Sequence, residues 1–332
     1  MNRFGRMLRV SLFGESHGPA VGVMIDGCPA GLPLTRKEFS ADLERRRPGS
    51  RGTTARSEED DPRILSGLFK DRTTGSPLTI VFENRDVRPD DYLAVKDLPR
   101  PGHADLTARL KYGGFHDYRG GGHFSGRLTV GLVAAGVVAR KLLEPCRIRA
   151  GLIEAGGSPD IETAVEAAVK DRDSVGGIIE CRASGVPAGW GEPFFDSVES
   201  LISHLIFAIP GVRGIEFGSG FACAGMRGSG CNDRIVDAEG ATATNHAGGI
   251  NGGISNGNEL VFRVAVKPTS SIGHEQETVD MRSGKAARLT IVGRHDACIA
   301  LRMPVIVEAA AALVLADLGL AAQAIPRIFK ES

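Results

Sequence analysis

Two histidines lie in turns beside short apolar segments, where an imidazole can reach a cleft. His17 stands in the sequence Gly-Glu-Ser-His-Gly (14–18), directly after a predicted strand at 8–13. His103 stands in Arg-Pro-Gly-His-Ala-Asp (100–105), and Asp105 is placed as the N-cap of a following helix, with His103 just outside that helix. Imidazoles suit proton transfer near neutral pH. The sequence therefore predicts two proton-transfer candidates, although His17 could equally satisfy backbone groups of its turn.

A run of arginines predicts anion binding. Five of the twelve residues from 45 to 56 are arginine and none is acidic, and the run begins at the end of a predicted helix, 36–47, that Pro48 terminates. Guanidinium groups bind phosphate and carboxylate oxygens with two parallel hydrogen bonds. The alternative is a solvated helix end whose cations complement the helix dipole. The glycine, serine and threonine residues around the run add donors, which favours anion binding.

A triple glycine at 120–122 is a weaker candidate for an anion site. It lies in a segment from Tyr118 to Arg127 that also holds His123 and Ser125. The segment leads into a predicted apolar helix, whose N-terminal amides would attract an anion. Tight packing of a loop against a buried helix would explain the same glycines, so the tract alone does not decide between the two.

In the C-terminal third, glycine-rich and polar segments adjoin predicted strands. Residues 245–257 contain five glycines, and residues 267–272 (Lys-Pro-Thr-Ser-Ser-Ile) and 293–298 (Gly-Arg-His-Asp-Ala-Cys) follow strands. Charge beside small hydroxyl or amide groups is typical of sites for phosphates and heterocycles. His246 alone indicates a structural role, and His295 can simply brace its loop.

Short strands and mostly buried helices must position these candidates. β-like runs occur at 8–13, 21–25, 63–69, 78–83, 176–181, 215–217, 260–266 and 289–292. Helical periodicity occurs at 36–47, 128–143, 161–170, 195–206 and 305–318. The helices at 128–143 and 305–318 are apolar almost all round, which predicts burial on most sides. At about 16 and 14 residues they are too short to span a membrane, so we expect them between sheets.

The chain reads as one domain, 1–332, because no linker rich in proline or serine divides it. Residues 21–39 and 176–195 both run from a strand through a Pro-Ala-Gly turn into a helix start. This similarity indicates an internal duplication or, alternatively, a reused turn.

Composition narrows the class of protein. Lys+Arg and Asp+Glu are both 40, so no global charge favours nucleic acid or an anionic membrane surface. The N-terminus carries no apolar signal core, which predicts a soluble, cytoplasmic protein. Six cysteines without a C-x-x-C pair indicate free thiols over disulfides or a zinc site, and no metal is expected. Neither a P-loop nor a G-x-G-x-x-G between strand and helix occurs.

Taken together, these segments resemble the chorismate synthase family. Matching blocks run from residue 13 to about residue 317, and they include 14–18, 45–49, 101–105, 245–257, 267–272 and 294–296. The resemblance implies an α+β fold, a β-α-β sandwich with largely buried apolar helices between antiparallel sheets, assembled as a homotetramer. It also implies a carbon–oxygen lyase acting on phosphates, in the shikimate pathway of aromatic amino acid biosynthesis. The reaction would be 1,4-anti elimination of phosphate from 5-enolpyruvylshikimate 3-phosphate to give chorismate, with no net redox change but a requirement for reduced FMN.

The resemblance also implies roles for individual residues. His17 would protonate the departing phosphate, His103 would protonate the reduced flavin, and Asp296 would help the flavin remove the ring proton. The substrate-binding arginines would be Arg46, Arg51 and Arg127. The flavin contacts would be His123, Phe124, Ser125, Gly252, Lys267, Pro268, Thr269, Ser270, Ser271 and Arg294.

One segment departs from the family pattern. Where many members have an arginine and a glutamate, this chain has His123 and Leu128, whereas Ser125, Arg127 and Thr129 match. An imidazole at position 123 would make affinity for a phosphate more dependent on pH. We therefore expect retained activity with altered flavin contacts.

Two other functions fit parts of this pattern. A flavin-dependent oxidoreductase on the same scaffold would depend strictly on NAD(P)H. A non-catalytic protein that binds a phosphorylated small molecule would bind without releasing phosphate, but it leaves the set His17, His103 and Asp296 unexplained. Some family members reduce their own flavin with NADPH. The lack of a dinucleotide motif or an added domain predicts a separate flavin reductant here.

Overall fold

The first sheet of the protein is antiparallel and carries the N-terminal histidine turn. The computed structural model describes residues 2–54, 56, 58–87, 92, 96–291 and 295–330. The strand order is β1 (Arg3–Phe4), β2 (Arg9–Gly14), β3 (Ala20–Asp26), β7 (Leu78–Glu83) and β4 (Arg63–Ser66). The pairing of β2 with β3 runs from Arg9 opposite Asp26 to Gly14 opposite Val21. The turn that contains His17 therefore connects β2 to β3 at the tip of this hairpin.

A second antiparallel sheet comes from the other half of the sequence. Its order is β10 (Val212–Phe217), β13 (Leu260–Val266), β9 (Gly177–Ser184) and β8 (Arg147–Ala155). Three two-stranded ribbons complete the described strands: β5 (Leu68–Phe69) with β6 (Arg72–Thr73), β11 (Ile250–Asn251) with β12 (Ile254–Ser255), and β14 (Glu275–Val279) with β15 (Ala286–Thr290). The segment 267–272 follows β13 directly, so the sheet fixes where that loop begins.

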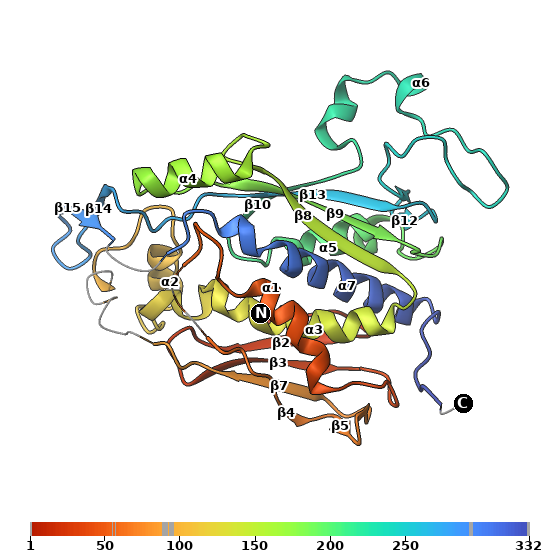
Figure 1. Ribbon diagram of the computed structural model, residues 1–332, viewed down its shortest axis with the longest axis horizontal. Coiled ribbons are helices and arrows are strands. Elements are labelled where there is room, and N and C mark those ends of the chain that lie inside the picture. Colours follow the sequence, from red (N-terminus) through yellow and green to blue (C-terminus); the bar gives the residue numbers. More distant parts are fainter. Residues whose placement is uncertain are drawn as a thin grey trace.

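Helices fill the space between the two sheets (Figure 1). The α-helices are α1 (Ser40–Arg46), α2 (Asp105–Lys111), α3 (Thr129–Leu142), α4 (Ile161–Asp171), α5 (Val198–Ile206), α6 (Gly228–Cys231) and α7 (Pro304–Ala321). The 3-10 helices are η1 (Arg36–Phe39), η4 (Arg119–Phe124), η5 (Gly126–Leu128), η6 (Phe194–Asp196), η7 (Gly220–Gly225) and η8 (Ile299–Arg302). Helix α3 contacts β2, β3 and β7 of the first sheet, whereas α7 contacts β8 and β9 of the second.

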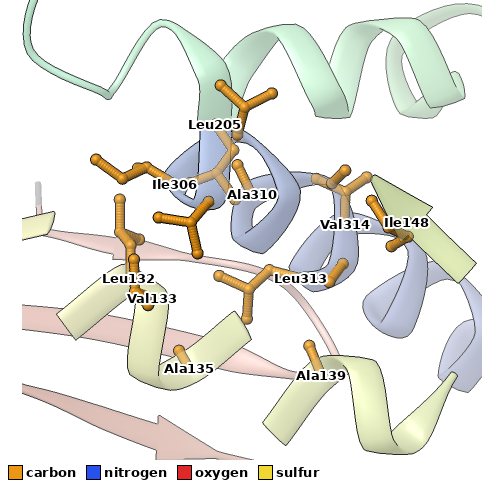
Figure 2. Close-up of a cluster of buried hydrophobic side chains, with 14 of the residues drawn as sticks. Leu132, Val133, Ala135, Ala139, Ile148, Leu205, Ile306, Ala310, Leu313 and Val314 are labelled. Carbon is orange, nitrogen blue, oxygen red and sulfur yellow. The ribbon is translucent and has the colours of Figure 1, made fainter. Parts of the chain in front are cut away.

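Small residues let the central layers approach closely. A Cβ atom on Gly136 of α3 would collide with Ala309 of α7, and one on Gly131 would lie 2.9 Å from a methyl group of Leu12 on β2. Figure 2 shows the apolar side chains of α3 and α7 facing each other, with Ile148 of β8 and Leu205 of α5 at the border of the cluster. The predicted burial of both helices is confirmed. The α+β class, with helices and antiparallel sheets, is also confirmed, and the sandwich and the internal duplication stay predictions.

Helix α7 is longer than its periodicity predicted. It has 18 residues and a mean hydropathy of 1.9, so its length and composition would allow it to cross a membrane, and the prediction that it is too short was wrong. In the structure 89% of this window is buried inside the protein, as expected for a core helix. The buried carboxylate of Asp317 within this apolar helix accepts hydrogen bonds from the backbone N–H groups of Arg6, Met7 and Leu8.

Candidate active site

A glycine loop brings the two predicted proton-transfer histidines together. Gly120, Gly121 and Gly122 of η4 have φ angles of 58°, 80° and 53°, a region that favours glycine. A Cβ atom on Gly120 would collide with the imidazole of His17, and a Cβ on Gly121 would lie 3.4 Å from Cε1 of His103. The triple glycine is therefore required for backbone shape and for access. The two imidazoles, 86 positions apart, lie against neighbouring residues of one loop.

His17 lies in a buried, cationic environment. The Arg56 guanidinium donates from Nη1 to the Ser16 hydroxyl at 2.8 Å and from Nη2 to the Ser16 carbonyl at 3.0 Å. Burial, followed by the charges of Arg56 and Arg119, lowers the pKa of His17 from 6.5 to about 4. Among the described residues, no group hydrogen-bonds to its Nδ1. His17 is therefore neutral at pH 7 in this structure.

His103 has a different set of neighbours. Its Nδ1 lies 2.7 Å from Oδ1 of Asp105, and Arg100 donates to the same carboxylate from Nε at 2.7 Å and from Nη2 at 2.9 Å. The prediction that Asp105 is the N-cap of α2 was wrong: Ala104 occupies that position and Asp105 is the first helical residue. Its carboxylate is engaged by Arg100 and His103 instead of by amides of the helix.

Asp296 is held between two loops. Its Oδ1 accepts from the Thr54 backbone N–H at 3.0 Å, and its Oδ2 accepts from Nη2 of Arg302 at 2.8 Å. The next residue, Ala297, donates its N–H to the Gly52 carbonyl at 2.8 Å. The loop that carries Asp296 is thus attached to the end of the arginine run.

Two of the predicted substrate arginines share one buried carboxylate. Arg46 donates from Nη2 to Oδ2 of Asp60 at 2.6 Å, and Nη1 of Arg127 bonds to the other oxygen. Burial lowers the pKa of Arg46 to about 10, against the opposing charge of Asp60. Two guanidinium groups and one carboxylate leave a surplus positive charge in the interior, which suits an anionic ligand.

A cavity of about 580 Å³ adjoins these groups. His103 and Gly120 line it together with eight of the ten predicted flavin contacts: His123, Phe124, Ser125, Lys267, Pro268, Thr269, Ser270 and Ser271. Lys267 and Ser270 both donate to the Gly102 carbonyl, and Arg100 donates to the Ser271 hydroxyl at 3.1 Å. The loop after β13 is therefore joined directly to the turn that carries His103.

Two predicted site residues among the described ones, Arg51 and Gly252, do not join this group. Arg51 has a side chain that is 68% exposed and pairs with Glu166 of α4. Gly252 lies in the turn between β11 and β12, and a Cβ there would meet nothing within 4 Å. Neither residue lines the cavity. Arg294 lies outside the described residues.

His17 and Asp296 reach the cavity only through neighbours. Gly120, which contacts His17, lines the cavity. A small hollow of about 20 Å³, lined by Arg46 and Arg302, shares Gly126, Thr129 and Ile299 with the cavity. Arg302 in turn holds Asp296, so both residues stand one side chain or one backbone segment behind the cavity wall.

Comparison with known proteins identifies the family of this chain. The family model described as chorismate synthase matches residues 8–320. The chain belongs to the chorismate synthase family. A chorismate synthase of Chitinophaga pinensis is 60% identical and covers 99% of this chain and 100% of its own length. One of Thermococcus kodakarensis is 46% identical over 94% of this chain and 96% of its own. A solved structure described as a crystal structure of chorismate synthase aligns with a TM-score of 0.74 at 26% identity, over 96% of this chain and 93% of that one.

Membership of the family confirms the predicted function. The chain is a carbon–oxygen lyase that forms chorismate in aromatic amino acid biosynthesis. The family implies a flavin cofactor and a small phosphorylated substrate. The assignment of individual residues stays a prediction.

The residue that departs from the family pattern lies at the cavity wall. His123 Nδ1 lies 2.8 Å from the Gly14 carbonyl, so this nitrogen carries the hydrogen and donates it. The Ser16 N–H donates to the Gly122 carbonyl at 3.1 Å close by. The imidazole therefore links the triple glycine to the turn of His17.

Several groups around the site were not assigned from the sequence. All four of Asp60, Asp105, Arg100 and Arg302 are buried or nearly so. Asp60 pairs with Arg46 and Arg302 pairs with Asp296, whereas Arg100 pairs with Asp105, which in turn contacts His103. Arg56 belonged to the arginine run but had no separate role. Of these residues, Arg100 and Asp105 could have been predicted as partners of His103, because they flank it in the motif 100–105.

Proposed function

We propose that this chain eliminates phosphate from 5-enolpyruvylshikimate 3-phosphate in a 1,4-anti sense to give chorismate, with reduced FMN bound in the cavity of about 580 Å³. His17, His103 and Asp296 would be its catalytic residues. The observation that carries the proposal is the position of both imidazoles against Gly120 and Gly121, with Arg56 near His17 and Arg100 beside His103.

The cavity has the lining that a flavin needs. Leu12, Phe124 and Ile299 offer apolar surface to a flat ring, and Ser125, Ser270 and Lys267 offer hydroxyl and ammonium groups. Its volume is within the usual range for cofactor sites. The residues 267–271, with His123, Phe124 and Ser125, would hold the cofactor, and Gly252 and Arg294 are added by resemblance alone. When bound, reduced FMN supplies electron density to the carbon skeleton that loses phosphate.

The arginines would bind and orient the substrate. Arg46 and Arg127 are fixed by Asp60, so they need little reorganisation when charge develops on the departing phosphate. Arg51 is included by resemblance. Interactions that strengthen as the C–O bond breaks accelerate the reaction, whereas equal binding of substrate would not.

His17 would act as the general acid toward phosphate. Its pKa of about 4 describes the protein without an anion. A phosphate beside the imidazole raises that pKa because opposite charge favours the protonated form. The proton would therefore be held only when the substrate is in place.

His103 and Asp296 would handle the other protons. His103 lines the cavity, where its free ring nitrogen can exchange a proton with the flavin. Asp296 is held in place by the Thr54 backbone N–H and by Arg302, so its carboxyl group would be positioned to accept the ring proton. General acid or base groups of this kind typically contribute about 10²–10⁴-fold.

Anaerobic turnover with chemically reduced FMN tests this function. Dithionite-reduced FMN, the protein and 5-enolpyruvylshikimate 3-phosphate should give chorismate, which is followed by its absorbance. His17→Ala and His103→Ala should each slow turnover about 10²–10⁴-fold with unchanged folding by circular dichroism, and Asp296→Asn should slow ring-proton removal. Strict dependence on NAD(P)H would instead support an oxidoreductase, and substrate binding without phosphate release would support a binding protein. Wild-type rates in either histidine variant would remove that residue from the mechanism.

The proposal also covers the assembly, the cellular location and the flavin reductant of the enzyme. Exposed phenylalanines at 194, 195 and 221 support assembly, for which we propose a homotetramer. The six free cysteines support a reducing, cytoplasmic location. We further propose a separate flavin reductant, one domain over residues 1–332, and a β-α-β sandwich derived from an internal duplication.

A further inference from the structure

Asp105 and Arg100 form a buried pair directly behind His103. The side chains of Arg100 and Asp105 are 6% and 8% exposed, and two hydrogen bonds join the guanidinium to the carboxylate. The Arg100 backbone N–H adds a third at 3.1 Å. This carboxylate is therefore fixed in position before any ligand binds.

The hydrogen bond to His103 defines the tautomer of the imidazole. Nδ1 lies 2.7 Å from Oδ1 of Asp105 and 3.1 Å from Nη2 of Arg100. Arginine has only donors, and a carboxylate has only acceptors when ionised. Nδ1 cannot accept a hydrogen bond from Arg100 and donate one to Asp105 at the same time. The contact with Asp105 is the shorter of the two, and a carboxylate oxygen can only accept, so it requires a hydrogen on Nδ1. The proton therefore sits on Nδ1, and Arg100 satisfies its own Nη2 on the carboxylate.

The other ring nitrogen lies on the side of the ring away from Asp105, and His103 itself lines the cavity. His103 Nε2 lies 3.6 Å from the position of a Cβ on Gly121, beside the loop that borders the cavity. Burial opposes ionisation of Asp105, but the hydrogen bonds from Arg100 and His103 outweigh it and hold the pKa of this carboxyl well below its usual range. The carboxylate thus stays ionised through the range in which enzymes work.

We propose that Asp105 is the positioning residue of His103: it keeps the proton on Nδ1, so that Nε2 exchanges protons with the ligand in the cavity. Arg100 holds Asp105 and also reaches Ser271 at 3.1 Å, so the same arm connects the imidazole to the loop 267–271. The inference rests on the proposed role of His103. An aspartate that orients a catalytic imidazole in this way is used by several hydrolase families, and its replacement by asparagine favours the wrong tautomer.

The first test reads the tautomer itself, in the absence of cofactor and substrate. Protein labelled with ¹⁵N in its histidine rings is compared with His103→Ala to assign the His103 signals. We expect the protonated nitrogen to be Nδ1 and the bare nitrogen to be Nε2 in the neutral form. In Asp105→Asn the amide can donate to Nδ1, so the proton should move to Nε2 in a large fraction of molecules. A wild-type His103 protonated on Nε2 overturns the inference, whatever the variants do.

The second test separates positioning from folding. Asp105→Asn should lower kcat about 10–100-fold with little change in KM, as for other partners that orient a histidine. The same substitution in a His103→Ala background should change kcat less than about 2-fold, because the group through which it acts is gone. Equal losses in both backgrounds would show a role unrelated to His103.

A matched control removes a different carboxylate that anchors the same helix. Asp97 pairs with Arg109 of α2 and with Arg282, and has no contact with His103. Asp97→Asn should keep the wild-type kcat and tautomer. A loss equal to that of Asp105→Asn would mean that any loosening of α2 is sufficient. If the wild-type protein forms no chorismate, the proposed function fails, whereas the tautomer measurement still decides the geometry.

Discussion

His17 and His103 lie against neighbouring glycines of one loop, yet the groups around the two imidazoles differ. His17 has two guanidinium groups near it, and no described group bonds to its Nδ1. His103 has an ionised carboxylate at hydrogen-bond distance. Burial and nearby cations keep the His17 imidazole neutral, whereas the His103 imidazole is oriented by a carboxylate. This difference suits the two separate proton-transfer roles that we propose for them.

The largest expected effect comes from filling the gap between the loop and His17. Gly120→Ala places a methyl group where the imidazole lies, at a φ of 58° that already disfavours a side chain. We expect a loss of turnover of about 10²-fold or more, since small displacements of a catalytic group are costly. Gly284→Ala is the control, because Gly284 also has a positive φ, 70°, but a Cβ there meets nothing within 4 Å and the residue does not line the cavity. Similar losses in both variants would show that alanine at a positive φ is sufficient to explain the effect.

The second prediction concerns stability at acid pH. The folded pKa of His17, about 4, lies below its unfolded value of 6.5, so the unfolded chain binds more protons between these values. Stability from this residue is therefore complete above pH 6.5 and is lost as the pH falls toward 4. We expect the free energy of unfolding of the wild type, relative to His17→Gln, to fall by about 1–2 kcal/mol between pH 7.5 and 4.5, after screening by solvent in the cavity.

Urea unfolding at several pH values measures this difference. The comparison with His17→Gln is needed because buried carboxylates, such as Asp60, also contribute less to the free energy of unfolding in acid. Parallel curves for the two proteins would mean that the imidazole of His17 titrates normally in the folded state.

Much of the fold follows from patterns that are local in the sequence. The strands predicted at 78–83 and 260–266 have those bounds in the structure, because alternating or continuous β-branched residues are read over a few positions. The predicted run 63–69 is two strands, β4 and β5, because Gly67 between them has a φ of 83°. A single glycine inside an apolar run does not show from sequence alone whether its φ is positive, so the break between the two strands could not be predicted.

The partners of the site residues could not be predicted in the same way. Arg46 and Asp60 are 14 positions apart, and Arg127 comes from another element. No local spacing in the sequence therefore predicts that these three residues interact. Arg302 holds Asp296 from the 3-10 helix that precedes α7. Asp105 did lie within a motif, but propensity rules favour an aspartate as a helix cap, and here tertiary contacts with Arg100 and His103 override that rule.

A smaller effect should follow from removing one of the cations near His17. Arg56→Gln is expected to raise the pKa of His17 above 4 but to leave it below 6.5, because burial is the larger cause of the shift and remains. Titration of the ring by NMR measures the change. Arg51→Gln is the control, since Arg51 lies five positions earlier, is exposed and pairs with Glu166. An unchanged pKa in Arg56→Gln would show that Arg56 does not contribute to the lowered pKa of His17.

The smallest expected effect sharpens the comparison at its border, where His123 joins the two turns. Nδ1 of His123 donates to the Gly14 carbonyl at 2.8 Å, and His123 lines the cavity. We expect His123→Ala to weaken the affinity for FMN by a few-fold, because this hydrogen bond holds the cavity wall in shape. His123→Gln keeps a donor for the Gly14 carbonyl, so it should weaken the affinity less. Isothermal titration with oxidised FMN measures both without turnover. Equal losses in the two variants would show that the hydrogen bond to Gly14 does not shape the cofactor site.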